Sequence, residues 1–246
     1  MERSFKTEVK ALRLGDGAEF HGEGILAVTK ALLQSGVSYV GGYQGAPVSH
    51  LLDVLVDAQD IMSELGVHLE TCTNEASAAA MLGASINYPL RGAVTWKSIV
   101  GTNVAADALS NLASPGVIGG AMIIIGEDYG EGASVIQERS YAYAMKSSMW
   151  LLDPRPDLPT IVRCVEQGFA LSEASNAPVM LELRIRACPL PSYPIRRVFR
   201  IAGSPVTSSA VLRSSRLSTG ANGAVPMPHS WKNRFSSKRS CAMPTA

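Results

Sequence analysis

The chain has 246 residues, 46% of them hydrophobic, which suffices for a buried core of about one to two domains. The net charge of +1 hides an asymmetry, because residues 1–182 carry all 21 acidic residues with 11 Lys and Arg, and residues 183–246 carry 11 Lys and Arg. No stretch approaches the ~20 apolar residues of a membrane span, and the N-terminus has no apolar signal core. We therefore expect a cytoplasmic protein with neither a membrane nor a nucleic-acid partner.

The cysteines argue against a metal cluster held by this chain. No two of them form the C-x-x-C pair of zinc ribbons and iron–sulfur loops, and their scatter is typical of unpaired thiols in a reducing compartment. We assign no metal ligand. The four cysteines are Cys72, Cys164, Cys188 and Cys241.

Short apolar runs alternate with longer segments of helical spacing along the first three quarters of the chain. The expected strands are 37–40, 67–69, 93–96, 121–125 and 179–183. The expected helices are 21–34, 48–65, 76–85, 102–113, 138–150 and 160–175. Continuous apolar strands that alternate with helices predict an α/β fold with a doubly wound, mainly parallel sheet covered on both faces.

Four loops follow the carboxyl ends of these strands, and they start near Gly41, Thr73, Lys97 and Gly126. Parallel strands end at one edge of a sheet, so we expect the four loops to meet there. That edge is where open α/β sheets bind their ligands.

The alternating pattern stops near Cys188. It divides the chain into an α/β domain, residues 8–188, and an irregular tail, residues 189–246, which is rich in Ser, Arg and Pro and has no acidic residue. One interpretation of the tail is a disordered basic arm. The interpretation we favour is a frameshifted continuation of a longer protein.

Asn74 and Glu75 stand between a short apolar strand, which we expect to be buried, and the helix 76–85 of mostly small residues. A carboxylate at the carboxyl end of a buried strand is where α/β folds carry out chemistry. The small residues behind it indicate that another backbone approaches closely. The alternative is that Glu75 complements the helix dipole.

Two other strand-to-helix loops have patterns that favour a ligand. The run from Gly41 to Pro47 has three glycines, which let main-chain N–H groups approach a ligand, and ends on a Pro suited to the first helical position. The run from Lys97 to Asn103 places a Lys beside the amides of a helix start, which suits an anionic group. A tight turn and a solvated Lys are the alternatives.

The loop after the strand 121–125 is acidic, with Glu127, Asp128 and Glu131. These carboxylates suit a cation, but carboxylates in a glycine-rich surface loop are more often solvated. The sequence leaves both interpretations open.

Together these loops resemble the 2-oxoacid:ferredoxin oxidoreductases, in particular the indolepyruvate type. The matching runs fall in the order of that family, at 31–37, 42–47, 73–76, 95–107 and 125–128. The resemblance covers roughly residues 8–188, which are similar to the family's pyrimidine-binding domain for thiamine diphosphate.

The resemblance implies an enzyme that converts an arylpyruvate, CoA and oxidised ferredoxin into acyl-CoA, CO₂ and reduced ferredoxin. It implies that Glu75 is catalytic and hydrogen-bonds the aminopyrimidine ring of thiamine diphosphate. Diphosphate and Mg²⁺ are then shared with a missing domain, and iron–sulfur clusters and CoA are handled outside this chain. The cofactor-binding residues that the resemblance implies are Gly42, Tyr43, Gly45, Pro47, Asn74, Lys97, Gly101 and Asn103.

Two residues depart from the family's usual G-Y-P-G-T-P loop, since Gln44 replaces a Pro and Ala46 replaces the Thr, which removes a hydroxyl group. The family's diphosphate domain and cluster cysteines are missing as well, so we expect a truncated enzyme that is inactive alone. Its expected partners are the remaining domains or subunit and ferredoxin, in a dimer or larger assembly. The alternatives are the pyrimidine domain of another thiamine diphosphate enzyme, of decarboxylase or synthase type, and a non-catalytic interaction module.

Overall fold

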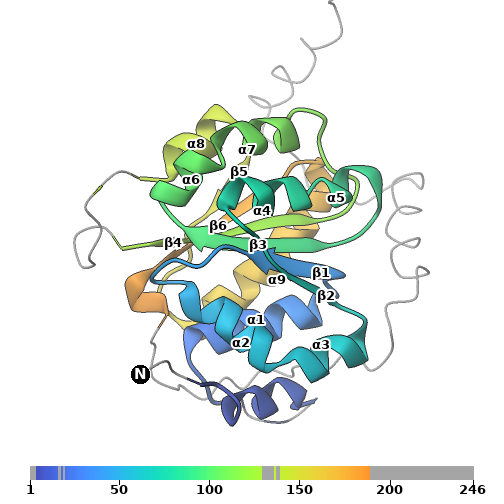
Figure 1. Cartoon of the computed structure of the whole chain (residues 1–246), viewed down its shortest axis with the longest axis vertical. Coiled ribbons are helices and arrows are strands. Elements are labelled where there is room, and N and C mark those ends of the chain that lie inside the picture. The colour runs from blue at the N-terminus through green and yellow to red at the C-terminus, as the bar shows by residue number, and fades with distance from the viewer. Residues whose placement is uncertain (1–3, 16–17, 19, 129–135, 137–138, 189–246) are drawn as a thin grey trace, which may run out of the picture. The chain divides into compact units, whose positions relative to one another are not determined.

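A computed structural model describes residues 4–15, 18, 20–128, 136 and 139–188 of the chain. The tail expected at 189–246, and Glu131 of the acidic loop, lie outside the described residues. Within the described part, helices cover both faces of one sheet (Figure 1). This arrangement confirms the α/β fold class that the alternation of strands and helices predicts.

Six strands of the described part form a sheet in the order β2-β1-β3-β4-β6-β5, in which every neighbouring pair is parallel. The central strand β4 is buried along its whole length, as its run of Met and Ile predicts. The strands are β1 Tyr39–Gly42, β2 His68–Thr71, β3 Gly92–Lys97, β4 Ala121–Glu127, β5 Trp150–Leu152 and β6 Val179–Arg184.

The helices form two layers, one on each face of the sheet (Figure 1). One layer contains α1 Gly24–Gln34, α2 Ser49–Asp57, α3 Gln59–Leu65 and α9 Leu158–Ser175. The other contains α4 Glu75–Met81, α5 Ala84–Asn87, α6 Val100–Val104, α7 Ala106–Ala113 and α8 Tyr141–Lys146. Two short 3₁₀ helices, η1 Glu8–Arg13 and η2 Ile185–Ala187, complete the described elements.

Each face of the sheet has its own hydrophobic core. Along β4, Met122 and Ile124 belong to the core beneath α1, α2 and α9, whereas Ile123 and Ile125 belong to the core beneath α4 and α7. The alternation follows from the two-residue period of a strand, which sends successive side chains to opposite faces. Trp96, on β3, is completely buried in the second core.

The helix expected at 138–150 is wrong at its carboxyl end. In the structure α8 ends at Lys146, and Trp150 begins the edge strand β5. Ser148 has a positive φ of 56°, which turns the chain out of the helix. The Trp150 indole then donates to Ser175 Oγ at 2.8 Å, which anchors the new strand on α9.

The strand before Asn74 is also not buried as expected. β2 lies at one edge of the sheet, and its residues are exposed or half-buried. Three expected helices are divided as well. The one at 48–65 breaks at Ala58 into α2 and α3, the one at 76–85 breaks at Leu82 and Gly83 into α4 and α5, and the one at 102–113 breaks at Ala105 into α6 and α7. The order of the expected elements is otherwise observed.

In the part of the chain that the structure describes, no helix combines the length and the apolar character that crossing a membrane requires.

Candidate active site

The four loops expected to meet do follow neighbouring strands. β2, β1, β3 and β4 are consecutive in the sheet and all parallel, so their carboxyl ends lie at one edge. The loops after them begin at Cys72, Tyr43, Ser98 and Asp128. The structure therefore places the predicted ligand-binding motifs along one side of the sheet.

Glu75 opens α4 and is 7% exposed. Asn74, the residue before it, is extended and caps the helix, because its Oδ1 accepts a hydrogen bond of 2.8 Å from the Ser77 amide. The carboxylate of Glu75 forms no hydrogen bond or ion pair with any other described residue. A carboxylate on a residue with so little exposure, and with no donor from the protein, suits a ligand that supplies the donor.

The glycine of the next motif lies directly against this side chain. A Cβ at Gly101 would stand 2.8 Å from both Cγ and Oε1 of Glu75, and 2.8 Å from Cδ1 of Trp96. Position 101 therefore has room only for glycine. Two motifs that are separate in the sequence, 73–76 and 95–107, form one wall in the structure.

The glycine-rich loop packs on the ends of β3 and β4. A Cβ at Gly45 would lie 2.3 Å from Cβ of Lys97, and one at Gly126 would lie 2.8 Å from Cδ of Pro47. These close approaches explain why the loop needs its small residues. The Tyr43 amide donates to Thr95 O at 2.9 Å, and the Tyr43 side chain is 41% exposed at the same edge.

Gly42 lies beside the same stretch of β3, because a Cβ there would be 2.2 Å from Thr95 O. Asn103, also predicted to bind the cofactor, contacts another helix. Asn103 is exposed on α6, and its Oδ1 accepts a hydrogen bond from the Tyr143 hydroxyl of α8. Asn103 thus connects two helices.

Lys97 does not present a free ammonium to an anion. Its Nζ lies 3.1 Å from Oδ2 of Asp128, whose side chain is only 4% exposed. Glu127 is buried too, and its Oε1 accepts a hydrogen bond of 2.6 Å from the Ser140 amide. The described carboxylates of the acidic loop therefore bind protein groups. Within the described residues, no three His, Cys, Asp or Glu form a group that suits a metal ion.

A series of buried, hydrogen-bonded side chains lies behind the site. None of these residues is among the predicted site residues. Trp96 Nε1 donates a hydrogen bond of 3.1 Å to Thr102 Oγ1. Thr102 Oγ1 in turn lies 3.3 Å from Ser98 Oγ. The hydroxyls of Ser98 and Ser140 are hydrogen-bonded to each other. The Ser140 amide donates to Glu127. The series connects β3, α6 and the start of α8. Its sequence signal is a pair of hydroxyl residues in the loop after a buried Trp.

Glu182 is a further residue that the sequence reasoning missed. It lies within the apolar strand β6 and is 4% exposed. Burial, and then the neighbouring Glu127, raise the pKa of Glu182 to about 8. A charged residue inside an otherwise apolar run, Val-Met-Leu-Glu-Leu, is the signal that could have found it.

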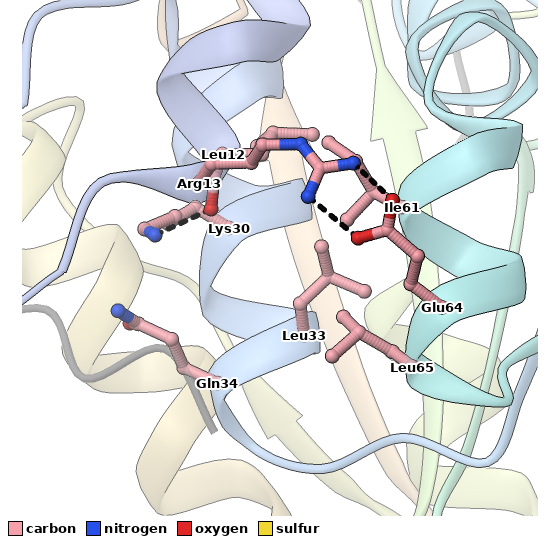
Figure 2. A pocket seen from close by; sticks show the side chains of 8 residues that line it. All are labelled: Leu12, Arg13, Lys30, Leu33, Gln34, Ile61, Glu64 and Leu65. Atoms are coloured by element: carbon pink, nitrogen blue, oxygen red, sulfur yellow. Dashed lines mark hydrogen bonds and ion pairs between the residues drawn. The ribbon is translucent and has the colours of Figure 1, made fainter. Parts of the chain in front are cut away.

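A separate cavity of about 200 Å³ lies between η1, α1 and α3, at the amino ends of β1 and β2 (Figure 2). Arg13 forms a bidentate ion pair with Glu64 across it, in which the two guanidinium nitrogens lie 2.5 and 2.6 Å from the two carboxylate oxygens (Figure 2). Lys30 donates to Leu12 O and Leu14 O at 2.6 Å each, which ties η1 to α1. These contacts hold η1 against α1 and α3, at the end of the sheet opposite Glu75.

Comparison with known proteins finds relatives of one kind. Over 160 residues the chain is 29% identical to the indolepyruvate oxidoreductase subunit IorA of Methanothermobacter thermautotrophicus. This match covers 65% of this chain and 25% of the relative. Over 161 residues it is 30% identical to IorA of Thermococcus kodakarensis, with 65% and 24% covered. The chain thus spans about a quarter of the length of these curated relatives. No protein family model matches it.

A solved structure supports the fold. The 2-oxoglutarate:ferredoxin oxidoreductase from Magnetococcus marinus, determined with 2-oxoglutarate, coenzyme A and succinyl-CoA bound, superimposes with a TM-score of 0.56. The match has 15% sequence identity and covers 73% of this chain and 31% of that one.

Proposed function

The chain belongs to the 2-oxoacid:ferredoxin oxidoreductase family, and from that premise we propose that its described domain binds the aminopyrimidine ring of thiamine diphosphate. The complete enzyme would be an indolepyruvate-type oxidoreductase that converts an arylpyruvate and CoA into acyl-CoA and CO₂ while it reduces ferredoxin. The observation that carries this proposal is Glu75 itself, a residue only 7% exposed whose carboxylate has no partner among the described residues.

Glu75 fits the pyrimidine end of the cofactor. A ring nitrogen that shares a proton with the carboxylate would supply the hydrogen bond that no described residue gives it. Gly101 packs against Cγ and Oε1 and so fixes the direction in which the carboxylate points. The loop of Gly42, Tyr43, Gly45 and Pro47 would form the neighbouring wall, and Asn74 would act by capping the helix that carries Glu75.

Thiamine diphosphate supplies a nucleophilic carbon that attacks the keto group of the substrate and stores electrons after CO₂ leaves. Glu75 would hold a proton at the pyrimidine ring nitrogen, which favours the imino form of the ring and makes its exocyclic nitrogen a base. This role needs a carboxyl group that exchanges a proton with the ring, and a Gln side chain cannot do so.

The described residues do not fit the diphosphate end. They contain no group of three or more His, Cys, Asp or Glu that suits a metal ion, and Lys97 is paired with Asp128. The whole chain also lacks a C-x-x-C pair for an iron–sulfur cluster. We therefore propose that other domains, or a second subunit, hold the diphosphate with Mg²⁺, the clusters and CoA, and that this chain alone has no turnover. The complex would be a dimer or larger assembly that passes electrons to ferredoxin.

Activity in a reconstituted complex tests the role of Glu75. We expect Glu75→Gln to lower turnover, measured as ferredoxin reduction with indolepyruvate and CoA, by about 10²–10⁴-fold. Glu70→Gln is the matched control, because Glu70 is an exposed carboxylate on the adjoining strand β2. Unchanged turnover in Glu75→Gln would favour a non-catalytic module. Decarboxylation without ferredoxin reduction would favour a decarboxylase or synthase.

Binding to the chain alone tests the division of the site. Thiamine diphosphate and Mg²⁺ titrated into the isolated chain should bind weakly, with shifts in the amide NMR signals of Glu75 and Gly101 at millimolar concentration. The Glu75→Gln variant should reduce these shifts, and Glu70→Gln should not. Tight binding by the isolated chain would contradict a site shared with another domain.

A further inference from the structure

Glu127 and Glu182 form a buried carboxyl pair away from Glu75. Glu127 ends β4 and is 3% exposed, and Glu182 lies on the adjacent strand β6 and is 4% exposed. The parallel register places Glu182 beside Ile125 and Glu127 beside Arg184. Two acidic side chains thus share one buried space between neighbouring strands.

The two oxygens of Glu127 have different surroundings. Oε1 accepts a hydrogen bond of 2.6 Å from the Ser140 amide. Oε2 is buried, and no N–H or hydroxyl group of the described residues donates to it. A buried acceptor without a donor is costly. The Glu182 carboxyl is within hydrogen-bonding reach of the Glu127 side chain. A hydrogen bond between two carboxyl groups exists only when one of them carries a proton.

We propose that Glu127 and Glu182 share one proton at neutral pH, and that this proton fastens the start of α8 to the sheet through Ser140. The bond is donated by the protonated carboxyl of one residue and accepted by the carboxylate of the other. Burial and the negative charge of Glu127 both favour the protonated form of Glu182 and raise its pKa to about 8.

The other charged groups around the pair do not remove the need for the proton. Asp153, which follows β5, adds a negative charge and raises the pKa of Glu182 further. Arg184 lowers that pKa, and its Nε lies 3.4 Å from Oε1 of Glu182. The same guanidinium, however, binds Asp153 at 2.5 Å. Asp128, next to Glu127, is paired with Lys97 on β3.

Loss of the proton would affect the candidate active site through a series of contacts. With both carboxyls charged, their repulsion weakens the packing that presents Glu127 to the Ser140 amide. Ser140 is hydrogen-bonded to Ser98, and Ser98 contacts Thr102 on α6. The residue before Thr102 is Gly101, which packs on Glu75. The protonated pair therefore stabilises the wall behind Glu75.

The free energy of unfolding of the full chain, measured by urea denaturation from pH 5 to pH 9, tests the shared proton. Glu182 has a pKa of about 8 in the folded chain and an ordinary pKa of 4.5. Between these values the folded state binds more protons, so stability falls as pH rises. The unfolding constant of the wild type should therefore rise more steeply with pH than that of Glu182→Gln. The difference should be up to about tenfold per pH unit.

Glu182→Gln is the informative variant because its amide donates to Glu127 permanently. It should therefore unfold less readily than the wild type at pH 9. Glu127→Gln should weaken the pH dependence too, since its amide can stabilise charged Glu182. Asp60→Asn, at an exposed position on α3, is the control and should keep the wild-type pH dependence. A wild-type slope equal to that of Glu182→Gln would overturn the proposal.

A second measurement uses the wild-type chain only. ¹³C NMR of the side-chain carboxyls should show a glutamate that titrates well above pH 6, and exchange of the Ser140 amide should accelerate beyond its intrinsic pH dependence as that glutamate ionises. Titration of every glutamate near its ordinary pKa would overturn the proposal. Neither measurement requires thiamine diphosphate, so failure here is separable from failure of the proposed function.

Discussion

Gly101 on α6 lies against the side chain of Glu75 on α4, so closely that a Cβ at position 101 would stand 2.8 Å from Cγ and Oε1 of the glutamate. The contact joins the loops after β2 and β3 into one surface. The position of the carboxylate consequently depends on α6 and on the hydrogen bond from Trp96 to Thr102, which holds α6 on β3.

Gly101→Ala should destabilise the domain and displace Glu75. The added methyl group forces either α6 or the glutamate to move, and overpacking of this kind costs about 1–3 kcal/mol. Urea denaturation measures the loss, and turnover of the reconstituted complex should fall as well. Gly15→Ala is the matched control, because nothing lies within 4 Å of a Cβ there. Equal stability of the two variants would contradict the close contact.

The Lys97–Asp128 pair should be strongly coupled. Replacing Lys97 by Met leaves the buried carboxylate of Asp128 without this ammonium, and breaking a buried pair in this way costs several kcal/mol, on the order of 3–5. A double-mutant cycle with Asp128→Asn measures the coupling energy. The exposed pair Arg13–Glu64 is the comparison, and its coupling should be clearly smaller. Similar coupling in both pairs would contradict the difference in burial.

Thr102→Val should remove the acceptor for the buried Trp96 indole while it keeps the shape of the side chain. We expect a loss of about 1–2 kcal/mol in the free energy of unfolding, together with a shift in tryptophan fluorescence. Thr29→Val is the control, because Thr29 is a buried threonine of α1 whose hydroxyl donates to Ile25 O. That variant should lose stability without a fluorescence shift; a shift in both would point to a general disturbance of packing.

Lys30 should make stability depend on pH in the alkaline range. Burial lowers its pKa from 10.5 to about 8. Between these values the unfolded chain binds more protons, so the free energy of unfolding rises with pH, and the unfolding constant falls by up to about tenfold per pH unit. Lys30→Met should abolish this rise. Lys10→Met, at an exposed position on η1, should retain it.

The Lys30 effect begins near the pH at which the Glu182 effect ends, and the two have opposite signs. Curves measured from pH 5 to pH 10.5 therefore separate them. Lys30 variants should alter the slope only in the alkaline limb, and Glu182→Gln should alter the slope only below about pH 8.

The fold was predictable because its central strands are uninterrupted apolar runs. The run Ala121–Ile125 is apolar without interruption, and only a strand covered on both faces buries every residue of such a run. The same reasoning failed at β5, since Trp150 follows a helical pattern and only the positive φ of Ser148 separates the two. It also failed at β2, because an apolar run of three residues does not distinguish a central strand from an edge strand.

The candidate site was predictable as a set of loops but not as a set of contacts. Glu75 stood out as a carboxylate at a strand end, and the order of parallel strands then brings its loop beside the others. Which side chains are engaged depends on packing across the sheet. The ion pair of Lys97 with Asp128 and the contact of Glu127 with Glu182 do not follow from spacing, because each joins residues of separate segments of the chain.

The edge strand β2 has a consequence for how the domain behaves when it is concentrated. An outer strand offers unpaired backbone groups to any other extended chain, and such edges are common starting points for aggregation. Here His68 and Glu70 are exposed along the strand, with Nε2 and Oε2 3.5 Å apart. Polar and charged side chains of this kind oppose the addition of a foreign strand. The segment that leads directly to Glu75 can therefore lie at the surface without seeding fibrils.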